Sequence, residues 1–292
     1  MTERIGIDLG GTKIEGVVMS RERAILRRER VATPHAYHDI VRAVAELVAA
    51  LWRTAPDASV GIGTPGASNA LGLLYNSNTV CLNGRPLRAD IEAAIGKPVR
   101  MVNDANCLAL SEATDGAAAG AEVVFGVILG TGVGGGVVVR GRVLSGPHGI
   151  AGEWGHNPLN IKGPKCYCGR RGCVETWLSG PAFAADFRRA GGAALKPAGI
   201  VAAARQGEPL AAACLARYLE RFGRALAVVV NILDPDVIVL GGGMSNVDEL
   251  YTEGPKRVRR HVFHPDWDGR IVRNRWGDSS GVRGAAWLWD EA

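Results

Sequence analysis

The stretch RIGIDLGGTKIEGVVMS, residues 4–20, decides the fold. Arg4–Leu9 has the pattern of a buried strand, Gly10-Gly11 gives it a sharp end, and Thr12–Ser20 follows as a second strand. The stretch EVVFGVILGTGVGGGVVVR, residues 122–140, repeats this order of strand, glycines and strand. The chain is therefore predicted to be an internal duplication whose halves form two lobes around a cleft, a common place for a ligand site.

The remaining segments fit an α/β fold. Ala24–Ala32 completes an antiparallel meander, and apolar residues at helical spacing predict a helix over Tyr37–Thr54. The other predicted strands are Ser59–Gly63, Val99–Val102, Val237–Leu240 and Arg270–Arg273, and the other predicted helices are Pro86–Ile95, Ala105–Ala113, Ala182–Arg189, Ala198–Arg205, Leu210–Leu233, Val247–Val262 and Ser279–Trp289. We expect a small lobe over 1–117 and a large lobe over 118–278, with the final helix in 279–292 a candidate to rejoin the first lobe.

Composition is that of an ordinary globular enzyme. The 292 residues are 47% hydrophobic and 22% charged, and the net charge of +5 fits an anionic substrate at least as well as a nucleic acid. The basic run 256–260 is expected to be a solvated helix face, so no nucleic acid partner is predicted. The sequence shows no signal peptide and no apolar run of membrane length, which predicts a cytoplasmic protein without a membrane partner.

A metal site is predicted in the loop GEWGHNPLNIKGPKCYCGRRGCVE, residues 152–175. It holds three thiols and an imidazole, enough for a closed tetrahedral zinc site. Four protein ligands leave no open position, so the Zn2+ would be structural; the alternative is a set of free thiols near a chance histidine. The predicted ligands are His156, Cys166, Cys168 and Cys173.

Three glycine-rich turns are candidates to hold a nucleotide. In the first, glycines allow backbone N–H groups to approach phosphate oxygens, Thr12 adds a hydroxyl, Lys13 adds a cation, and Asp8 could hold Mg2+ directly or through water. The alternative is a plain hairpin with a solvated lysine. The predicted nucleotide residues here are Asp8, Gly10, Gly11, Thr12 and Lys13.

The second turn, residues 130–136, contains a G-x-G-x-x-G pattern. The residues that follow it, 137–139, are β-branched valines and predict a strand, whereas a dinucleotide-binding fold needs a helix there. We therefore expect a hairpin that wraps phosphate. The third turn, residues 240–243, leaves room for an adenine or a ribose. The predicted nucleotide residues in these two turns are Gly130, Thr131, Gly132, Gly134, Gly135, Gly136, Gly241 and Gly242.

The reactive group is predicted at Asn103-Asp104, where a strand ends and a helix begins. Asp104 could be only a helix cap, but phosphoryl transfer to an alcohol needs a carboxylate that accepts the hydroxyl proton. Asn103 would bond a neighbouring hydroxyl, and Glu153, His156 and Glu175 add further polar groups. Such a set suits a polyhydroxylated ligand, because each buried hydroxyl needs a partner.

Taken together, these motifs resemble the ROK family of bacterial sugar kinases. The motifs are I-D-L-G-G-T-K (7–13), V-N-D-A-N (102–106), G-T-G-V-G-G-G (130–136), E-W-G-H (153–156) and C-Y-C-G-R-R-G-C-V-E (166–175). The resemblance implies a duplicated actin-like (ribonuclease H-like) ATPase fold, ATP and Mg2+, a structural zinc and a homodimer. It places Asp104 on the catalytic base and implies that His156 serves both zinc and sugar. The implied sugar-binding residues are Gly66, Asn78, Asn103, Asp104, Glu153, His156 and Glu175.

Within that family the chain looks most similar to the manno(fructo)kinase type, through segments 76–84, 151–159, 230–247 and 277–289. This likeness implies ATP-dependent phosphorylation of a hexose at its 6-hydroxyl, with fructose first and mannose or glucose also accepted. Glucokinases and N-acetylglucosamine kinases share the core motifs and remain alternatives. The loop 160–165 looks short for this type. Two rivals are an actin-like ATPase scaffold and a sugar-sensing regulator without kinase activity, which would carry a helix-turn-helix before the first strand.

Overall fold

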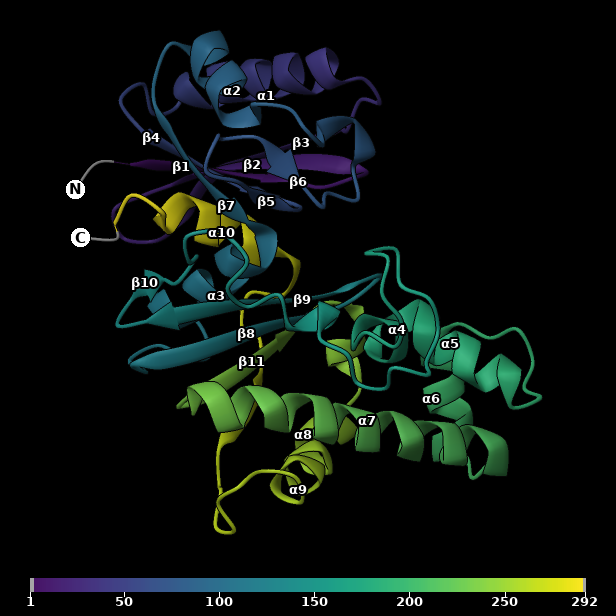
Figure 1. The fold of residues 1–292 in the computed structure, drawn as a ribbon. Coiled ribbons are helices and arrows are strands. Elements are labelled where there is room, and N and C mark those ends of the chain that lie inside the picture. The colour runs from purple at the N-terminus through teal and green to yellow at the C-terminus, as the bar shows by residue number, and fades with distance from the viewer. Residues whose placement is uncertain (1–2, 291–292) are drawn as a thin grey trace. The chain divides into compact units, whose positions relative to one another are not determined.

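Two five-stranded sheets with the same strand order form the framework of the protein (Figure 1). The computed structural model describes residues 3–290; the predicted domain ranges also include residues 1, 2, 291 and 292, which lie outside the described part. The first sheet has the order β3-β2-β1-β4-β7. Its strands are β1 (Arg4–Leu9), β2 (Lys13–Met19), β3 (Ile25–Ala32), β4 (Ser59–Thr64) and β7 (Val99–Asn103).

The second sheet has the order β10-β9-β8-β11-β12. In the first sheet β4 runs parallel to β1 and β7, and in the second β11 runs parallel to β8 and β12. The shared order confirms the predicted duplication. The strands are β8 (Val123–Leu129), β9 (Val133–Val139), β10 (Arg142–Val143), β11 (Val237–Gly241) and β12 (Arg270–Arg273), and a small ribbon pairs β5 (Ala67–Ser68) with β6 (Leu74–Tyr75).

The predicted helices are present in the structure, with one exception. The expected long helix over 247–262 is wrong: α8 (Glu249–Thr252) and α9 (Gly254–Arg259) replace it, because Pro255 has no N–H to donate to the preceding turn. Among the described residues, no helix combines the length and apolar character needed to cross a bilayer. The other helices are α1 (Tyr37–Trp52), α2 (Leu87–Ile95), α3 (Asp104–Thr114), α4 (Glu175–Leu178), α5 (Gly180–Arg189), α6 (Pro197–Arg205), α7 (Pro209–Leu233) and α10 (Ser280–Trp287).

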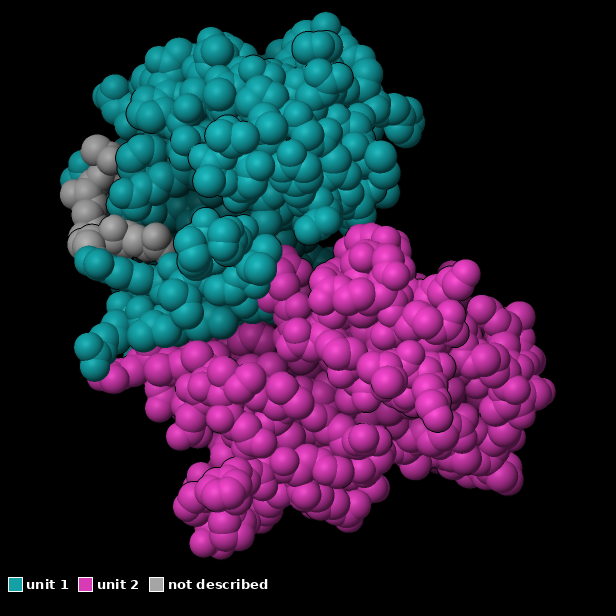
Figure 2. Space-filling view, viewed as in Figure 1, with its two compact units in different colours: residues 1–120, 136–152, 278–292 teal, residues 121–135, 153–277 magenta. Residues whose placement is uncertain are grey.

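The chain divides into two compact units (Figure 2). Unit 1 comprises residues 1–120, 136–152 and 278–292, and unit 2 comprises residues 121–135 and 153–277. Residues 136–152 therefore group with unit 1 and not with the predicted second lobe. One reason is that Gly136 lies against α3, where an added Cβ would be 2.5 Å from the Ala105 carbonyl oxygen. The predicted boundary near residue 117 stays a prediction.

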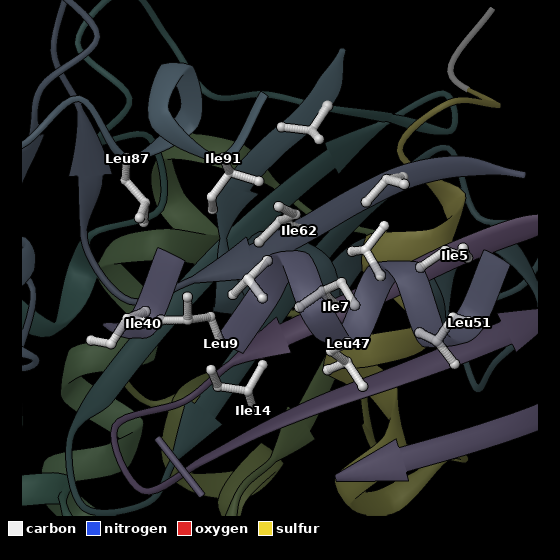
Figure 3. Packing of buried hydrophobic residues seen from close by; sticks show 14 of the residues in the cluster. Ile5, Ile7, Leu9, Ile14, Ile40, Leu47, Leu51, Ile62, Leu87 and Ile91 are labelled. Carbon is white, nitrogen blue, oxygen red and sulfur yellow. The ribbon is translucent and has the colours of Figure 1, made fainter. Parts of the chain in front are cut away.

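The core of unit 1 lies between its sheet and α1 with α2 (Figure 3). Alternate residues of β1, among them Ile5 and Ile7, are fully buried in the same apolar cluster as Ile40 of α1. The other face of the sheet receives α10. An added Cβ on Gly6 would lie 2.1 Å from the Val282 carbonyl oxygen, so the backbones of β1 and α10 meet where no side chain fits.

The close approach of β1 to α10 predicts how a methyl group added at Gly6 would change the stability of the protein. Gly6→Ala is expected to lower the free energy of unfolding by about 3 kcal/mol, because the α10 backbone must move away from the sheet. Urea denaturation measures the change. Gly199→Ala in α6 is the matched control: the nearest atom to its added Cβ is 3.7 Å away, so it should be neutral or stabilising by roughly 0.5–1 kcal/mol. Equal stability of the two variants would contradict the packing described for α10.

Candidate active site

The predicted reactive group lies in unit 1, where β7 passes into α3. Asn103 caps this helix: its side-chain oxygen accepts a hydrogen bond from the Ala105 N–H at 2.9 Å. The N-cap position is therefore held by Asn103 and not by Asp104. Asp104 is the first residue of the helix, and its Oδ1 accepts from the Ala105 N–H at 2.8 Å. The positive end of the helix dipole favours the ionised carboxylate there, as a proton acceptor requires.

Gly66 and Asn78 also belong to unit 1. The Asn103 side-chain amide donates to the Gly66 carbonyl oxygen at 3.2 Å. Gly66 has φ +87°, and an added Cβ would lie 2.4 Å from the Tyr75 carbonyl oxygen, so only glycine fits. Asn78 is exposed, with its Oδ1 3.9 Å from the position that a Cβ on Gly11 would take. The structure thus joins Gly66 to Asn103 and places Asn78 beside the first glycine turn.

Asp8 is the next-to-last residue of β1, before the fully buried Leu9, and its carboxylate interacts with that of Asp104. Burial first, and then the charges of Asp104 and Glu15, raise its pKa from 3.8 to about 7, while Lys13 acts in the opposite direction. Two carboxylates that interact in a buried place are a donor set suited to a hard divalent cation, which binds oxygen ligands. The residues present therefore fit a magnesium site at Asp8.

The first glycine turn is a tight hairpin between β1 and β2. The Gly10 N–H donates to the Lys13 carbonyl oxygen at 3.0 Å, and the Thr33 hydroxyl donates to the Gly10 carbonyl oxygen at 2.6 Å. Gly11 and Thr12 at its tip are exposed. The predicted binding of phosphate by this turn stays a prediction.

Lys13 has a partner that the sequence analysis missed. Its Nζ lies 3.3 Å from Oε2 of Glu15, which is only 1% exposed and also receives the Arg30 Nε at 2.8 Å. Glu15 faces Asp8 across the β1–β2 pair. The sequence does contain a signal for this partner, because Glu15 is a charged residue inside the apolar run of β2. Lys13 is thus paired with a buried acid while its side chain stays 45% exposed, so its phosphate-binding role stays a prediction.

The second glycine turn lies in unit 2 up to Gly135. The Gly130 N–H donates to the Gly132 carbonyl oxygen at 2.9 Å, and β9 begins at Val133, as expected for a hairpin rather than a dinucleotide fold. The Val133 N–H donates to Glu175 Oε2 at 2.9 Å, and a Cβ on Gly132 would lie 2.6 Å from that oxygen. The carboxylate therefore packs against the turn itself. The other predicted residues of this turn in unit 2 are Thr131, Gly134 and Gly135.

The turn also contacts the E-W-G-H segment. The Trp154 indole N–H donates to the Gly134 carbonyl oxygen at 3.0 Å, and an added Cβ on Gly155 would lie 1.9 Å from the Val133 carbonyl oxygen. Glu153 directly precedes a short 3-10 helix, Trp154–His156. Burial raises the pKa of Glu153, and the nearby charge of Glu175 adds to the effect. Glu153, Glu175 and the second glycine turn therefore form one arrangement within unit 2.

The third glycine turn has a packing explanation. Gly241 ends β11, and Gly242 has φ +81° with its Cβ position 2.5 Å from the Leu129 carbonyl oxygen. The Ser245 hydroxyl donates to the Gly242 carbonyl oxygen at 2.7 Å. Glycine is therefore required at position 242 by the close approach to β8, whichever ligand binds nearby.

The four predicted metal ligands come together in unit 2. Their donor atoms all lie within 4.8 Å of one another, with 3.5 Å between Cys166 Sγ and His156 Nδ1 and 3.6 Å between Cys168 Sγ and Cys173 Sγ. A tetrahedral zinc with Zn–S bonds of about 2.3 Å would separate two sulfurs by about 3.8 Å. The donor set fits Zn2+ in both chemistry and spacing. The other histidine nitrogen, Nε2, lies 3.0 Å from the Tyr167 hydroxyl, a residue that the sequence analysis did not single out.

Two sheets of identical order, each with a glycine turn between its first two strands, together with the carboxylate at the start of α3, define a sugar kinase with the actin-like ATPase fold. The family model of the ROK family matches residues 4–292, so the chain belongs to this family and the resemblance is confirmed. Its sequence is 42% identical to an N-acetyl-D-glucosamine kinase of Salmonella heidelberg (strain SL476), covering 97% of this chain and 98% of that protein.

Solved structures agree with this placement. The ROK hexokinase of Thermus thermophilus matches with a TM-score of 0.87 and 35% identity, covering 98% of this chain and 97% of that one. A ROK family glucokinase of Streptomyces griseus, solved with glucose and AMPPNP, matches with a TM-score of 0.82 and 30% identity over 98% of both chains.

The Cys3His cluster predicts one zinc per chain, measurable by elemental analysis of freshly purified protein. Cys168→Ala should lose the metal and weaken sugar binding together, because Glu153 and Glu175 lie at the two ends of the loop that it ties down. Cys81→Ala, at a thiol outside the cluster, is the control and should retain both. Zinc-free wild-type protein would contradict this prediction.

The raised pKa of Asp8 predicts that the folding stability of the metal-free protein depends on pH. The folded state holds this proton more tightly than the unfolded state, so stability falls as pH rises from 3.8 to about 7. Asp8→Asn removes that cost and should raise the melting temperature more at pH 8 than at pH 5 in the presence of EDTA. A stabilisation that is the same at both pH values would show that the ionisation of Asp8 is not responsible.

Proposed function

We propose that this protein transfers a phosphoryl group from ATP to the 6-hydroxyl of a hexose, with Asp104 as general base. The observation that supports this most directly is the position of Asp104 in the first turn of α3, beside a capping Asn103 and close enough to Asp8 to raise its pKa. A carboxylate so placed can accept the hydroxyl proton while the sugar oxygen bonds to the γ-phosphorus and ADP leaves.

The other roles follow the chemistry of each group. The backbone N–H groups of the exposed hairpin tip at Gly11 and Thr12, and of the turn 130–132, hold phosphate oxygens. Asp8 is the residue that would hold Mg2+, and the bound ion would supply charge neutralisation on the phosphates. Gly66, Asn78 and Asn103 in unit 1, and Glu153, His156 and Glu175 in unit 2, are proposed to bind sugar hydroxyls.

The identity of the sugar is the finer part of the proposal. The motif likeness favours fructose, but the full-length similarity is to a protein named as an N-acetyl-D-glucosamine kinase, and the structural matches are named as a hexokinase and a glucokinase. We therefore propose N-acetylglucosamine as the first candidate and place glucose, mannose and fructose after it. A coupled ADP assay with these four sugars ranks them by kcat/KM. Hydrolysis or inactivity with every sugar would favour the sugar-sensing or scaffold alternatives.

Three further properties are proposed on the resemblance together with the structure. The Zn2+ is structural, because three sulfurs and one nitrogen already complete its tetrahedron. The protein forms a homodimer, which light scattering after size-exclusion chromatography tests. It acts in the cytoplasm on a small-molecule sugar, without a nucleic acid or membrane partner.

Asp104→Asn tests the base directly. The amide keeps the size of the side chain and can still accept from the Ala105 N–H through its oxygen, so the fold should remain. It cannot take a proton, and kcat is expected to fall by about 10²–10⁴-fold with little change in sugar affinity. Steady-state kinetics and a thermal melt measure the two effects. Near-normal kcat would remove Asp104 from this role.

A further inference from the structure

Tyr167 lies against the outer nitrogen of His156. Its hydroxyl is 3.0 Å from His156 Nε2, and its ring meets the imidazole edge-on, with centroids 5.1 Å apart and an interplanar angle of 89°. In sequence it stands between two predicted zinc ligands, Cys166 and Cys168, so the loop that brings the sulfurs together also fixes the tyrosine.

The direction of this hydrogen bond follows from the geometry of the cluster. His156 Nδ1 is the nitrogen that faces Cys166 Sγ, at 3.5 Å, and so is the one available to a metal. A neutral imidazole that offers Nδ1 to a metal carries its proton on Nε2 and donates it to a neighbouring acceptor. With a metal on Nδ1, that acceptor would be the Tyr167 oxygen. The phenolic O–H of Tyr167 is then left to donate to another group.

The surroundings of that O–H are those proposed for the sugar. Tyr167 contacts His156 directly, and both residues belong to unit 2 together with Glu153 and Glu175, the other residues proposed there to bind sugar hydroxyls. Tyr167 is 66% exposed, so a ligand can reach its side chain. A sugar oxygen that approached His156 Nε2 would also come within reach of the tyrosine hydroxyl, 3.0 Å from that nitrogen.

We propose that Tyr167 is a sugar-binding residue of this chain, whose hydroxyl donates to a hexose oxygen and extends the reach of His156. The proposal rests on the sugar-binding part of the proposed function. It makes Tyr167 a determinant of affinity and of the choice among hexoses, since sugars differ in the oxygens that they present at one place.

Tyr167→Phe removes the hydroxyl and keeps the ring. Sugar binding is measured by calorimetry in the Asp104→Asn background, without nucleotide, using the hexose with the highest kcat/KM in the wild-type protein or, if none is turned over, N-acetylglucosamine. We expect about tenfold weaker binding, the size of effect that one lost hydrogen bond gives. Zinc content and melting temperature should not change, because Tyr167 supplies no metal donor atom.

Tyr37→Phe is the matched control, since it removes the same hydroxyl from a tyrosine bonded to Asp90 in α2 of unit 1. It should leave sugar affinity unchanged. In the active enzyme, Tyr167→Phe should raise KM for the sugar with kcat within about twofold and change the ranking of the four sugars. Unchanged or tighter binding, or loss of zinc, would overturn the proposal.

The binding measurement needs no phosphoryl transfer. If the wild-type protein bound the sugar in a Tyr167-dependent way but never consumed ATP, the kinase assignment would fail and the role of Tyr167 would stand. If the kinase were active and Tyr167→Phe bound the sugar normally, only the inference about Tyr167 would fail.

Discussion

The site depends on places where the backbone comes too close to neighbouring atoms for any side chain to fit. In unit 2 the segment E-W-G-H reaches the second glycine turn only because Gly155 has no Cβ to meet the Val133 carbonyl oxygen. Gly132 leaves space in the same way for the Glu175 carboxylate, which then accepts from the Val133 N–H. The glycines therefore fix the position of the Glu175 carboxylate. The proposed phosphate-binding role thus falls on residues that packing already requires to be glycine.

Each unit then contains a pair of carboxylates whose charges interact. Asp8 with Asp104 in unit 1 and Glu153 with Glu175 in unit 2 are held close enough for one acid to raise the pKa of the other. Such pairs oppose folding, because burial and like charge both disfavour ionisation. The ligands proposed for this protein, which supply cations and hydroxyl donors, would relieve this electrostatic cost on binding.

Much of the fold and the site could be predicted from sequence because the signals are local. Strand, glycines and strand recur at residues 4–20 and 122–140, and both sheets share one order. The spacing of the thiols and His156 predicts a cluster that the structure brings together. The rest depends on contacts between distant residues. The pairing of Lys13 with buried Glu15 is a tertiary contact that the local pattern does not reveal. The break of the expected long helix could have been predicted from Pro255 itself.

The sequence motifs do not predict which hexose is preferred, and the reason is physical. Carboxylates such as Asp104 and Glu175 and amides such as Asn103 are typical of groups that bind hydroxyls, and every hexose has hydroxyls to offer them. Discrimination requires a residue outside this common set that meets the oxygens or substituents in which the sugars differ. The role proposed for Tyr167 has that character: the predicted zinc ligands on either side fix its position, while its own side chain supplies no donor atom to the cluster. A loop held together at its sulfurs can thus carry a side chain that is free to serve the sugar without being needed for the fold.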